Sequence, residues 1–208
     1  AGKNVGRYHH VCAFFDRRDE EYSVLGSFFK EGLEWGEKSV HIVDPHLTTD
    51  HVERLKECGI DTDHCQACGQ LDVLTWDDAY LSGGTFDQER MLGAIEGVLA
   101  AGLEAGYPKM RIMGNMNWTL KGNPGTEQVI EFESRVNETL ARSGQMAVCV
   151  YDSAKLSGAM MMDILRSHPL TLVGNVIYEN PFYTPPEQLL SEIRSRHRDR
   201  SGGVATIK

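Results

Sequence analysis

The stretch Val11-Cys-Ala-Phe-Phe15, followed by Asp16-Arg-Arg-Asp-Glu-Glu21, decides the fold class of this chain. Its first five residues are all apolar, which is typical of a strand buried on both faces of a parallel sheet. The acidic residues that follow favour a helix N-terminus, because their charge complements the helix dipole. This helix is expected over 19–35, with Gly36 as its stop. The stretch therefore predicts a strand that leads directly into a helix.

The same alternation continues along the chain. Further strands are predicted from short runs rich in Val, Ile, Leu and Met, at 39–43, 71–75, 110–113, 146–151 and 170–177. Helical patterns are present at 49–58, 86–105, 126–142, 157–167 and 187–198. The second of these helices, at 86–105, is expected to begin with a capping box, in which Thr85 is the N-cap and Gln88 reaches back. Alternating strands and helices predict an α/β fold of three layers, with a mainly parallel sheet and helices on both faces.

No linker, internal repeat or low-complexity segment divides the chain. We therefore expect a single domain over 9–198, preceded by a flexible N-terminus at 1–8 and followed by a tail at 199–208. Ligands of such folds bind beyond the carboxyl ends of the strands, so the residues that end each strand are the first candidates for a site.

Composition excludes several classes of protein. The chain has 208 residues, with 30 Asp and Glu against 21 Lys and Arg, and a net charge of −9. This acidic balance argues against direct nucleic-acid binding, which depends on Lys and Arg. No apolar run approaches the ~20 residues that span a bilayer, and residues 1–10 lack the hydrophobic stretch of a signal peptide. A cytoplasmic protein without membrane contact is expected.

The turn after the first strand argues against a nucleotide site. A phosphate-binding loop needs glycines there, so that backbone N–H groups can approach the anion. This turn contains no glycine and four carboxylates, on Asp16, Asp19, Glu20 and Glu21. A nucleotide-binding remnant is therefore disfavoured.

Four residues form the most metal-like feature of the sequence: Cys58, His64, Cys65 and Cys68. Two cysteines at the spacing of Cys65 and Cys68 can hold one side of a tetrahedral zinc ion. A second well-spaced pair is missing, however, and Cys65 and Cys68 are expected in a polar loop. No cofactor is expected, and a zinc- or thiol-based redox sensor at this loop is the alternative hypothesis.

Two further groups of residues are candidates for ligand contact. His10 and Cys12 are two residues apart, hence on one side of the first strand, where they could bind a metal, polarise a ligand or form a structural pair. Trp76, Trp118 and Tyr151 follow predicted strands and would either line a pocket or pack the end of the core.

Acid–base chemistry has no clear place in the sequence. Asp44, Asp77, Asp78 and Asp152 follow strands, but Asp at such positions also caps the next helix. Neither Gly-x-Ser-x-Gly nor His-Glu-x-x-His is present. We therefore expect a protein that is not an enzyme.

Several motifs together resemble the MEDS domain, the sensory domain named for methanogens, methylotrophs and the dichloromethane regulator DcmR. They are His10-Val-Cys-Ala-Phe-Phe-Asp16, Gly36-Glu-Lys-Ser-Val-His-Ile-Val-Asp-Pro45, Gly69-Gln-Leu-Asp-Val-Leu-Thr-Trp76, Tyr80-Leu-Ser-Gly-Gly-Thr-Phe-Asp87, Val148-Cys-Val-Tyr-Asp152 and Asn180-Pro-Phe-Tyr183. Each piece is weak alone, whereas the combination is specific and extends from about residue 9 to 186.

The resemblance implies a degenerate RecA/KaiC-like domain without a phosphate-binding loop, and a sensor of simple hydrocarbon derivatives. It implies ligand contacts from His10 and Cys12, with Trp76, Trp118 and Tyr151 lining the pocket. It also implies an output partner that is a transcriptional regulator or a kinase, because no such module is attached here, and a homodimer. The Cys65 and Cys68 pair is not part of the family pattern.

Overall fold

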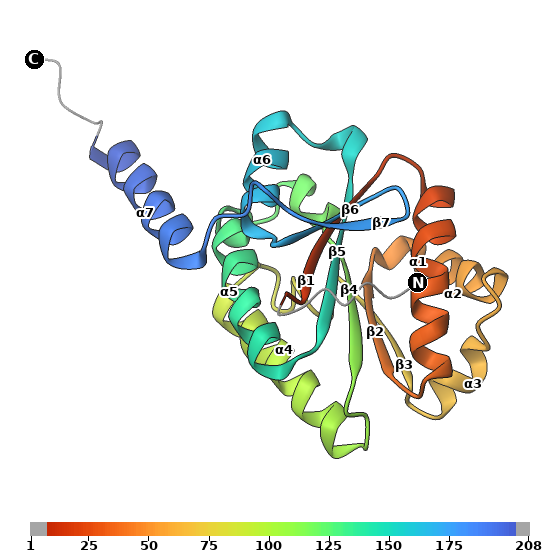
Figure 1. Cartoon of the computed structure of the whole chain (residues 1–208). Helices are drawn as coiled ribbons and strands as arrows, with labels where there is room; N and C mark the ends of the chain where they lie inside the picture. Colours follow the sequence, from red (N-terminus) through yellow and green to blue (C-terminus); the bar gives the residue numbers. More distant parts are fainter. Residues whose placement is uncertain (1–7, 203–208) are drawn as a thin grey trace, which may run out of the picture.

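Seven strands form one sheet in the order β3-β2-β4-β5-β1-β6-β7 (Figure 1). The computed structural model describes residues 8–202. The strands are β1 His10–Phe15, β2 Lys38–Val43, β3 Leu71–Thr75, β4 Met110–Asn115, β5 Met146–Asp152, β6 Leu170–Val173 and β7 Val176–Glu179. Neighbouring strands are parallel except β6 and β7. The predicted mainly parallel sheet is confirmed.

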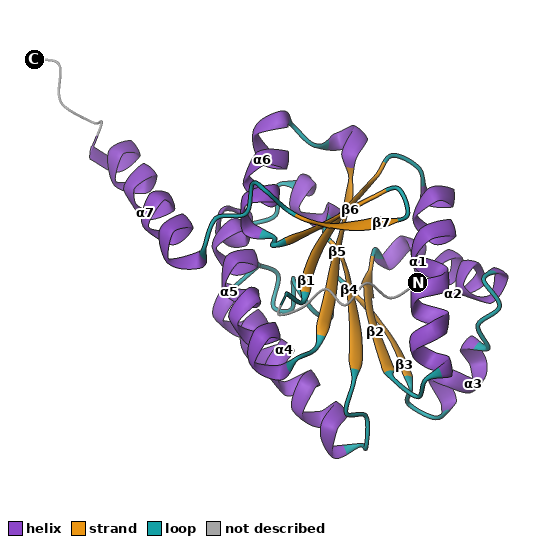
Figure 2. Cartoon of the chain, viewed as in Figure 1, coloured by secondary structure: helices purple, strands orange, loops and turns teal. Residues whose placement is uncertain are grey.

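Helices cover both faces of this sheet (Figure 2). They are α1 Arg18–Glu34, α2 Thr48–Glu57, α3 Thr62–Ala67, α4 Gln88–Glu104, α5 Val129–Ser143, α6 Gly158–Ser167 and α7 Pro186–Gly202. Short 3-10 turns lie at Pro45–Leu47, Asn117–Lys121, Thr126–Gln128 and Ser153–Lys155. α1, α2 and α3 pack on one face and α4 and α5 on the other, so the three predicted layers are present.

Strand alternation divides the core between the two faces. On β1, Val11, Ala13 and Phe15 pack in the apolar layer beneath α1 and α2. Cys12 points the opposite way, into the layer beneath α4 and α5. This follows from the two-residue period of a strand, and it places His10 and Cys12 on the side of α5.

A chain of buried hydrogen bonds ties α1 and α2 to the sheet. Tyr22 Oη lies 2.5 Å from His51 Nδ1, and His51 Nε2 lies 2.8 Å from His41 Nδ1. His41 Nε2 in turn lies 2.8 Å from Ser39 Oγ. Burial lowers the pKa of His51 to about 4 and that of His41 well below its usual value, so both rings are neutral members of the packed core.

The structure corrects three expectations about local elements. The predicted strand 170–177 is a hairpin, because Gly174 adopts a positive φ of 57° and reverses the chain between β6 and β7. The N-cap of α4 is Asp87, whose carboxylate accepts from Arg90 N–H at 2.8 Å. Thr85 Oγ1 donates instead to Pro124 O at 3.0 Å, so the capping box is wrong.

The cysteine-rich segment is the third correction. It forms α3 rather than a polar loop, since Asp61 accepts from His64 N–H and caps the helix. At the C-terminus, α7 continues to Gly202, four residues beyond its predicted end. The remaining parts of the expected flexible N-terminus and tail, 1–7 and 203–208, lie outside the described residues.

Candidate functional site

The most unusual feature of the interior is a polar group enclosed between the sheet and α5. It consists of four residues that we call the buried cluster: His10, Glu133, Cys149 and His168. Their exposed fractions are 1%, 0%, 7% and 0%. Buried charged residues must find partners inside the protein, because they lose their contact with water. The neighbours of Glu133 therefore decide what this site can do.

Glu133 lies at the centre of the buried cluster. Its Oε2 atom is 3.2 Å from His10 Nε2, 3.4 Å from His168 Nε2 and 3.6 Å from Cys149 Sγ. Its other oxygen, Oε1, accepts a hydrogen bond from Tyr151 Oη at 2.8 Å. His10 Nε2 is also 3.2 Å from Cys149 Sγ. Four side-chain donor atoms thus converge, all within 4.8 Å of one another.

Register and helix spacing explain the convergence. β1 and β5 are paired so that Cys12 lies beside Cys149, with His10 one pleat earlier on the same face. On α5, Glu133 and Asn137 are four residues apart and so face the sheet together. His168 follows the last turn of α6. The buried cluster therefore needs β1, α5, β5 and the end of α6.

The outer nitrogens of both imidazoles are fixed by neighbours. His168 Nδ1 lies 2.8 Å from Ile164 O, which can only accept a hydrogen bond. His10 Nδ1 lies 3.3 Å from Asn137 Oδ1. The amide of Asn137 is oriented by its Nδ2, which donates to the carbonyls of Glu133, Ser134 and Ser167. His168 Nδ1 therefore donates to Ile164 O, and the Nε2 atoms of both rings face Glu133 Oε2.

Electrostatics follow from burial and from these neighbours. Burial lowers the pKa of His10 to about 4 and raises the pKa of the Cys149 thiol well above its usual value. Burial alone would raise the pKa of Glu133, but His168 and His10 outweigh it and hold this pKa well below the usual range. Glu133 is therefore an ionised carboxylate in the protein interior.

A small cavity adjoins the buried cluster. Its volume is about 30 Å³, and His10, Glu133 and Cys149 form one part of its wall. The rest of the wall is mainly apolar, and includes Ile42, Met91, Ile95, Ile112, Phe132, Val136, Leu140 and Ala147. The cavity thus combines an apolar body with one polar end.

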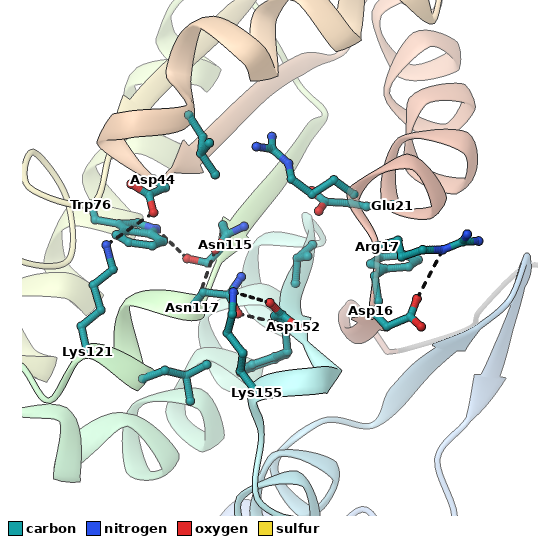
Figure 3. A pocket seen from close by; sticks show the side chains of 16 residues that line it. Asp16, Arg17, Glu21, Asp44, Trp76, Asn115, Asn117, Lys121, Asp152 and Lys155 are labelled. Atoms are coloured by element: carbon teal, nitrogen blue, oxygen red, sulfur yellow. Dashed lines mark hydrogen bonds and ion pairs between the residues drawn. The ribbon is translucent and has the colours of Figure 1, made fainter.

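A larger pocket of about 340 Å³ lies at the carboxyl ends of the strands (Figure 3). Its charged side chains are largely paired with one another: Lys121 lies 3.4 Å from Asp44, and Lys155 lies 2.6 Å from Asp152. Arg17 and Arg18 also line the pocket and lie 3.8 Å from Asp16 and 2.8 Å from Asp50, so each of its cations has a carboxylate neighbour that competes with a phosphate. This agrees with the glycine-free turn at the start of α1.

Comparisons with known proteins agree with this fold. The family described as MEDS, the MEthanogen/methylotroph, DcmR Sensory domain, matches residues 9–169. The chain belongs to the MEDS family. The MEDS domain is 24% identical over 169 residues to the transcriptional repressor DcmR of Methylorubrum extorquens, covering 81% of this chain and 61% of the repressor. The chain thus spans about three fifths of that relative's length, and the match supports a role in sensing and regulation.

The architecture of the MEDS domain also resembles a solved structure. A KaiC-like protein from Pyrococcus horikoshii OT3 aligns with a TM-score of 0.55 and 13% identity, over 79% of this chain and 69% of that one. At this identity the match shows the fold alone, and it confirms the expected RecA/KaiC-like class. None of the helices among the described residues is both long and apolar enough to cross a membrane.

The structure separates the five residues expected to contact ligand. His10 belongs to the buried cluster, and Cys12 is buried nearby, with its Sγ donating to Leu170 O at 3.5 Å. Trp76 and Tyr151 line the strand-end pocket, and Tyr151 also reaches Glu133. Trp118 is fully buried between Tyr80 and Phe86 and lines neither cavity. The five residues of the MEDS domain do not form one site.

The cysteines of α3 do not gather into a comparable site. Cys65 is buried and Cys68 is exposed, with Cys68 Sγ donating to Cys65 O. Cys58 lies after α2 and its Sγ donates to Tyr22 O. Within the described part of the MEDS domain, the His, Cys and Glu donor atoms that converge are those of the buried cluster instead. A zinc or redox site on α3 stays a prediction.

Sequence reasoning missed three of the four cluster residues. Cys149, His168 and Glu133 are not among the residues that the sequence analysis expects to contact a ligand or a metal. One signal was available: Glu133 falls on the same helical face as Val129, Phe132, Val136 and Leu140, all of them buried. A carboxylate within an apolar stripe indicates a buried polar partner.

Proposed function

We propose that this MEDS domain is a sensor without enzymatic activity, and that it binds a small organic molecule in the cavity beside the buried cluster. The supporting observation is the composition of the cavity wall, which is apolar except for His10, Tyr80, Glu133 and Cys149. Such a wall suits a molecule with a short hydrocarbon part and one polar or halogen atom.

Size restricts the ligand further. By the same measure of volume, about 10–15 Å³ holds one water molecule. The cavity of about 30 Å³ therefore has room for roughly two or three non-hydrogen atoms without rearrangement. Methanol, formaldehyde, methanethiol and chloromethane fall within this class, as the family resemblance also suggests.

Signal output is proposed to require another protein or segment. The relative DcmR is a transcriptional repressor, and the matched region covers 61% of it. We propose that ligand binding changes how α5 and α6 pack on β1 and β5, because the buried cluster joins these elements. The output partner would be a transcriptional regulator or a kinase that contacts this helical face.

The proposal is tested by thermal unfolding with each of these small molecules. A ligand at 100 times its Kd adds about 2.7 kcal/mol, which corresponds to a rise in Tm of about 5–10 °C for a chain of this size. Ala147→Val narrows the cavity and should abolish the shift. Lys155→Gln, in the strand-end pocket, should leave the shift unchanged.

Two results would contradict the proposal. If the ligand shift survives Ala147→Val and disappears in Lys155→Gln, the ligand occupies the strand-end pocket. If no member of the class changes the Tm of the unmodified protein, the domain does not sense these molecules through the cavity.

A further inference from the structure

We infer that the buried cluster is a metal site, in which His10, Glu133, Cys149 and His168 together bind one divalent transition-metal ion, with Zn²⁺ as the best match. The inference rests on the proposed function only for the part played by the adjoining cavity. Its main observation is that four metal-ligating atoms converge from four separate elements of the fold.

The distances within the buried cluster fit a tetrahedral ion. Typical Zn–N, Zn–O and Zn–S bonds of about 2.0–2.3 Å imply ligand-to-ligand distances of about 3.3–3.6 Å in a tetrahedron. Oε2 of Glu133 lies 3.2, 3.4 and 3.6 Å from the atoms of His10, His168 and Cys149. His10 Nε2 and Cys149 Sγ are 3.2 Å apart. Four of the six tetrahedral edges are thus already close to the required length.

The centre of the buried cluster brings together atoms that can each bind a cation. The Nε2 atoms of both histidines, Oε2 of Glu133 and Sγ of Cys149 face one another. Within the described residues, His168 Nε2 is fully buried and has no hydrogen-bond partner. A cation between these atoms would satisfy all of them at once.

The outer contacts are those that metal-binding histidines normally have. A ligating imidazole usually donates its other N–H to a carbonyl or carboxylate, which fixes the ring orientation. His168 does so to Ile164 O, and His10 to Asn137 Oδ1. Tyr151 Oη donates to Glu133 Oε1, the oxygen that would not bind the metal, and so fixes the orientation of this carboxylate. These supporting contacts are present around all but Cys149.

Charge balance also favours a divalent ion. On binding, Cys149 loses its proton to solvent and becomes a thiolate, while both histidines coordinate as neutral imidazoles. The thiolate and the Glu133 carboxylate then neutralise the two positive charges, so the buried site carries no net charge. A mixed set of two imidazoles, one thiolate and one carboxylate suits Zn²⁺ rather than Mg²⁺ or Ca²⁺.

The cavity gives this site an open side. Three of the four ligands, His10, Glu133 and Cys149, line the cavity. A small molecule that enters from this side could place an oxygen or sulfur atom on the ion as an additional ligand. The metal would then provide the polar end of the proposed sensor cavity.

Elemental analysis of the full chain, purified without chelator or added metal, tests the inference. We expect about one zinc per chain in the unmodified protein and at least a tenfold lower content in Glu133→Gln and Cys149→Ser. Cys12→Ser is the matched control: Cys12 lies beside Cys149 in the sheet and is buried, but is outside the four ligands. This variant should keep its metal.

A second measurement covers the case in which the variants fail to fold. The unmodified protein is stripped of metal and titrated with Co²⁺, which should give tetrahedral d–d bands and a thiolate charge-transfer band at one equivalent. A protein that is metal-free as purified and shows no such bands overturns the inference. It is also overturned if Cys65→Ser or Cys68→Ser removes the metal while Cys149→Ser keeps it. Neither measurement uses an organic ligand, so failure of the metal site and failure of ligand sensing are distinguishable.

Discussion

At the scale of single residues, the protein places ionisable side chains where water does not reach. Glu133 tolerates burial because His10, His168 and Tyr151 surround it. Glu21 is different: it is 6% exposed, and among the described residues its carboxylate has no hydrogen-bond or ion-pair partner. The contrast between the two glutamates leads to a prediction about pH.

Burial raises the pKa of Glu21 to about 7, although Arg18 and Arg54 oppose the shift and Asp50 and Asp152 add to it. The native state therefore binds a proton between pH 4.5 and 7 that the unfolded state does not bind. Hence the free energy of unfolding should fall as the pH rises through this window. Glu21→Gln should remove that slope and raise the free energy of unfolding at pH 8 by about 3 kcal/mol.

Urea unfolding of both proteins at pH 5 and pH 8 measures this difference. Glu20→Gln, a change on the neighbouring residue of α1, serves as the control and should alter the free energy of unfolding by less than about 1 kcal/mol at either pH. Equal effects of the two changes would show that Glu21 is not destabilised by its surroundings.

At the scale of elements, the sequence pattern predicted the type and position of the strands and helices, but not the contacts that cap a helix. The bounds of β1 to β5 were predicted within two residues, because apolar runs identify buried strands. The start of α4 was wrong, since Thr85 and Asp87 can both cap a helix and only the contact with Pro124 decides between them. Local patterns carry no information about such distant partners.

The N-cap of α4 can be tested directly. Asp87→Ala should lower the free energy of unfolding by about 1 kcal/mol, because the N–H of Arg90 loses its acceptor. Asp87→Asn should retain most of the stability, since an amide oxygen can replace the carboxylate. Chemical denaturation of the three proteins gives the comparison. If Asp87→Ala leaves the free energy of unfolding unchanged while Gln88→Ala lowers it, the capping box with Thr85 is correct instead.

At the scale of the whole molecule, the fold and family were predictable, whereas the site was not. Alternating strands and helices indicated the three layers, and short motifs distributed over the chain indicated MEDS. The buried cluster could not be derived in this way, because His10 and Cys149 are 139 positions apart. Only the pairing of β1 with β5 brings them together.

Burial across the molecule predicts the order in which its cysteines react. All five are free thiols; Cys68 is exposed, Cys58 is intermediate, and Cys12, Cys65 and Cys149 are buried. Iodoacetamide under native conditions should label Cys68 first and Cys58 more slowly, while the buried thiols react only after unfolding. Peptide mass mapping over time measures this order. Labelling of Cys149 as fast as Cys68 would mean that the buried cluster opens readily to solvent.

The position of β1 between β5 and β6 has a consequence for biosynthesis. β1 is the first strand of this domain to be synthesised, and it cannot take its place in the sheet until both of its neighbours, which begin at Met146 and Leu170, have been made. The last residue of the buried cluster to be synthesised is His168, which comes just before β6. Nascent chains therefore carry an unpaired β1 while most of this domain is translated, and a domain cut short before His168 would lack the pairing of β1 with β6 and the site that His168 completes.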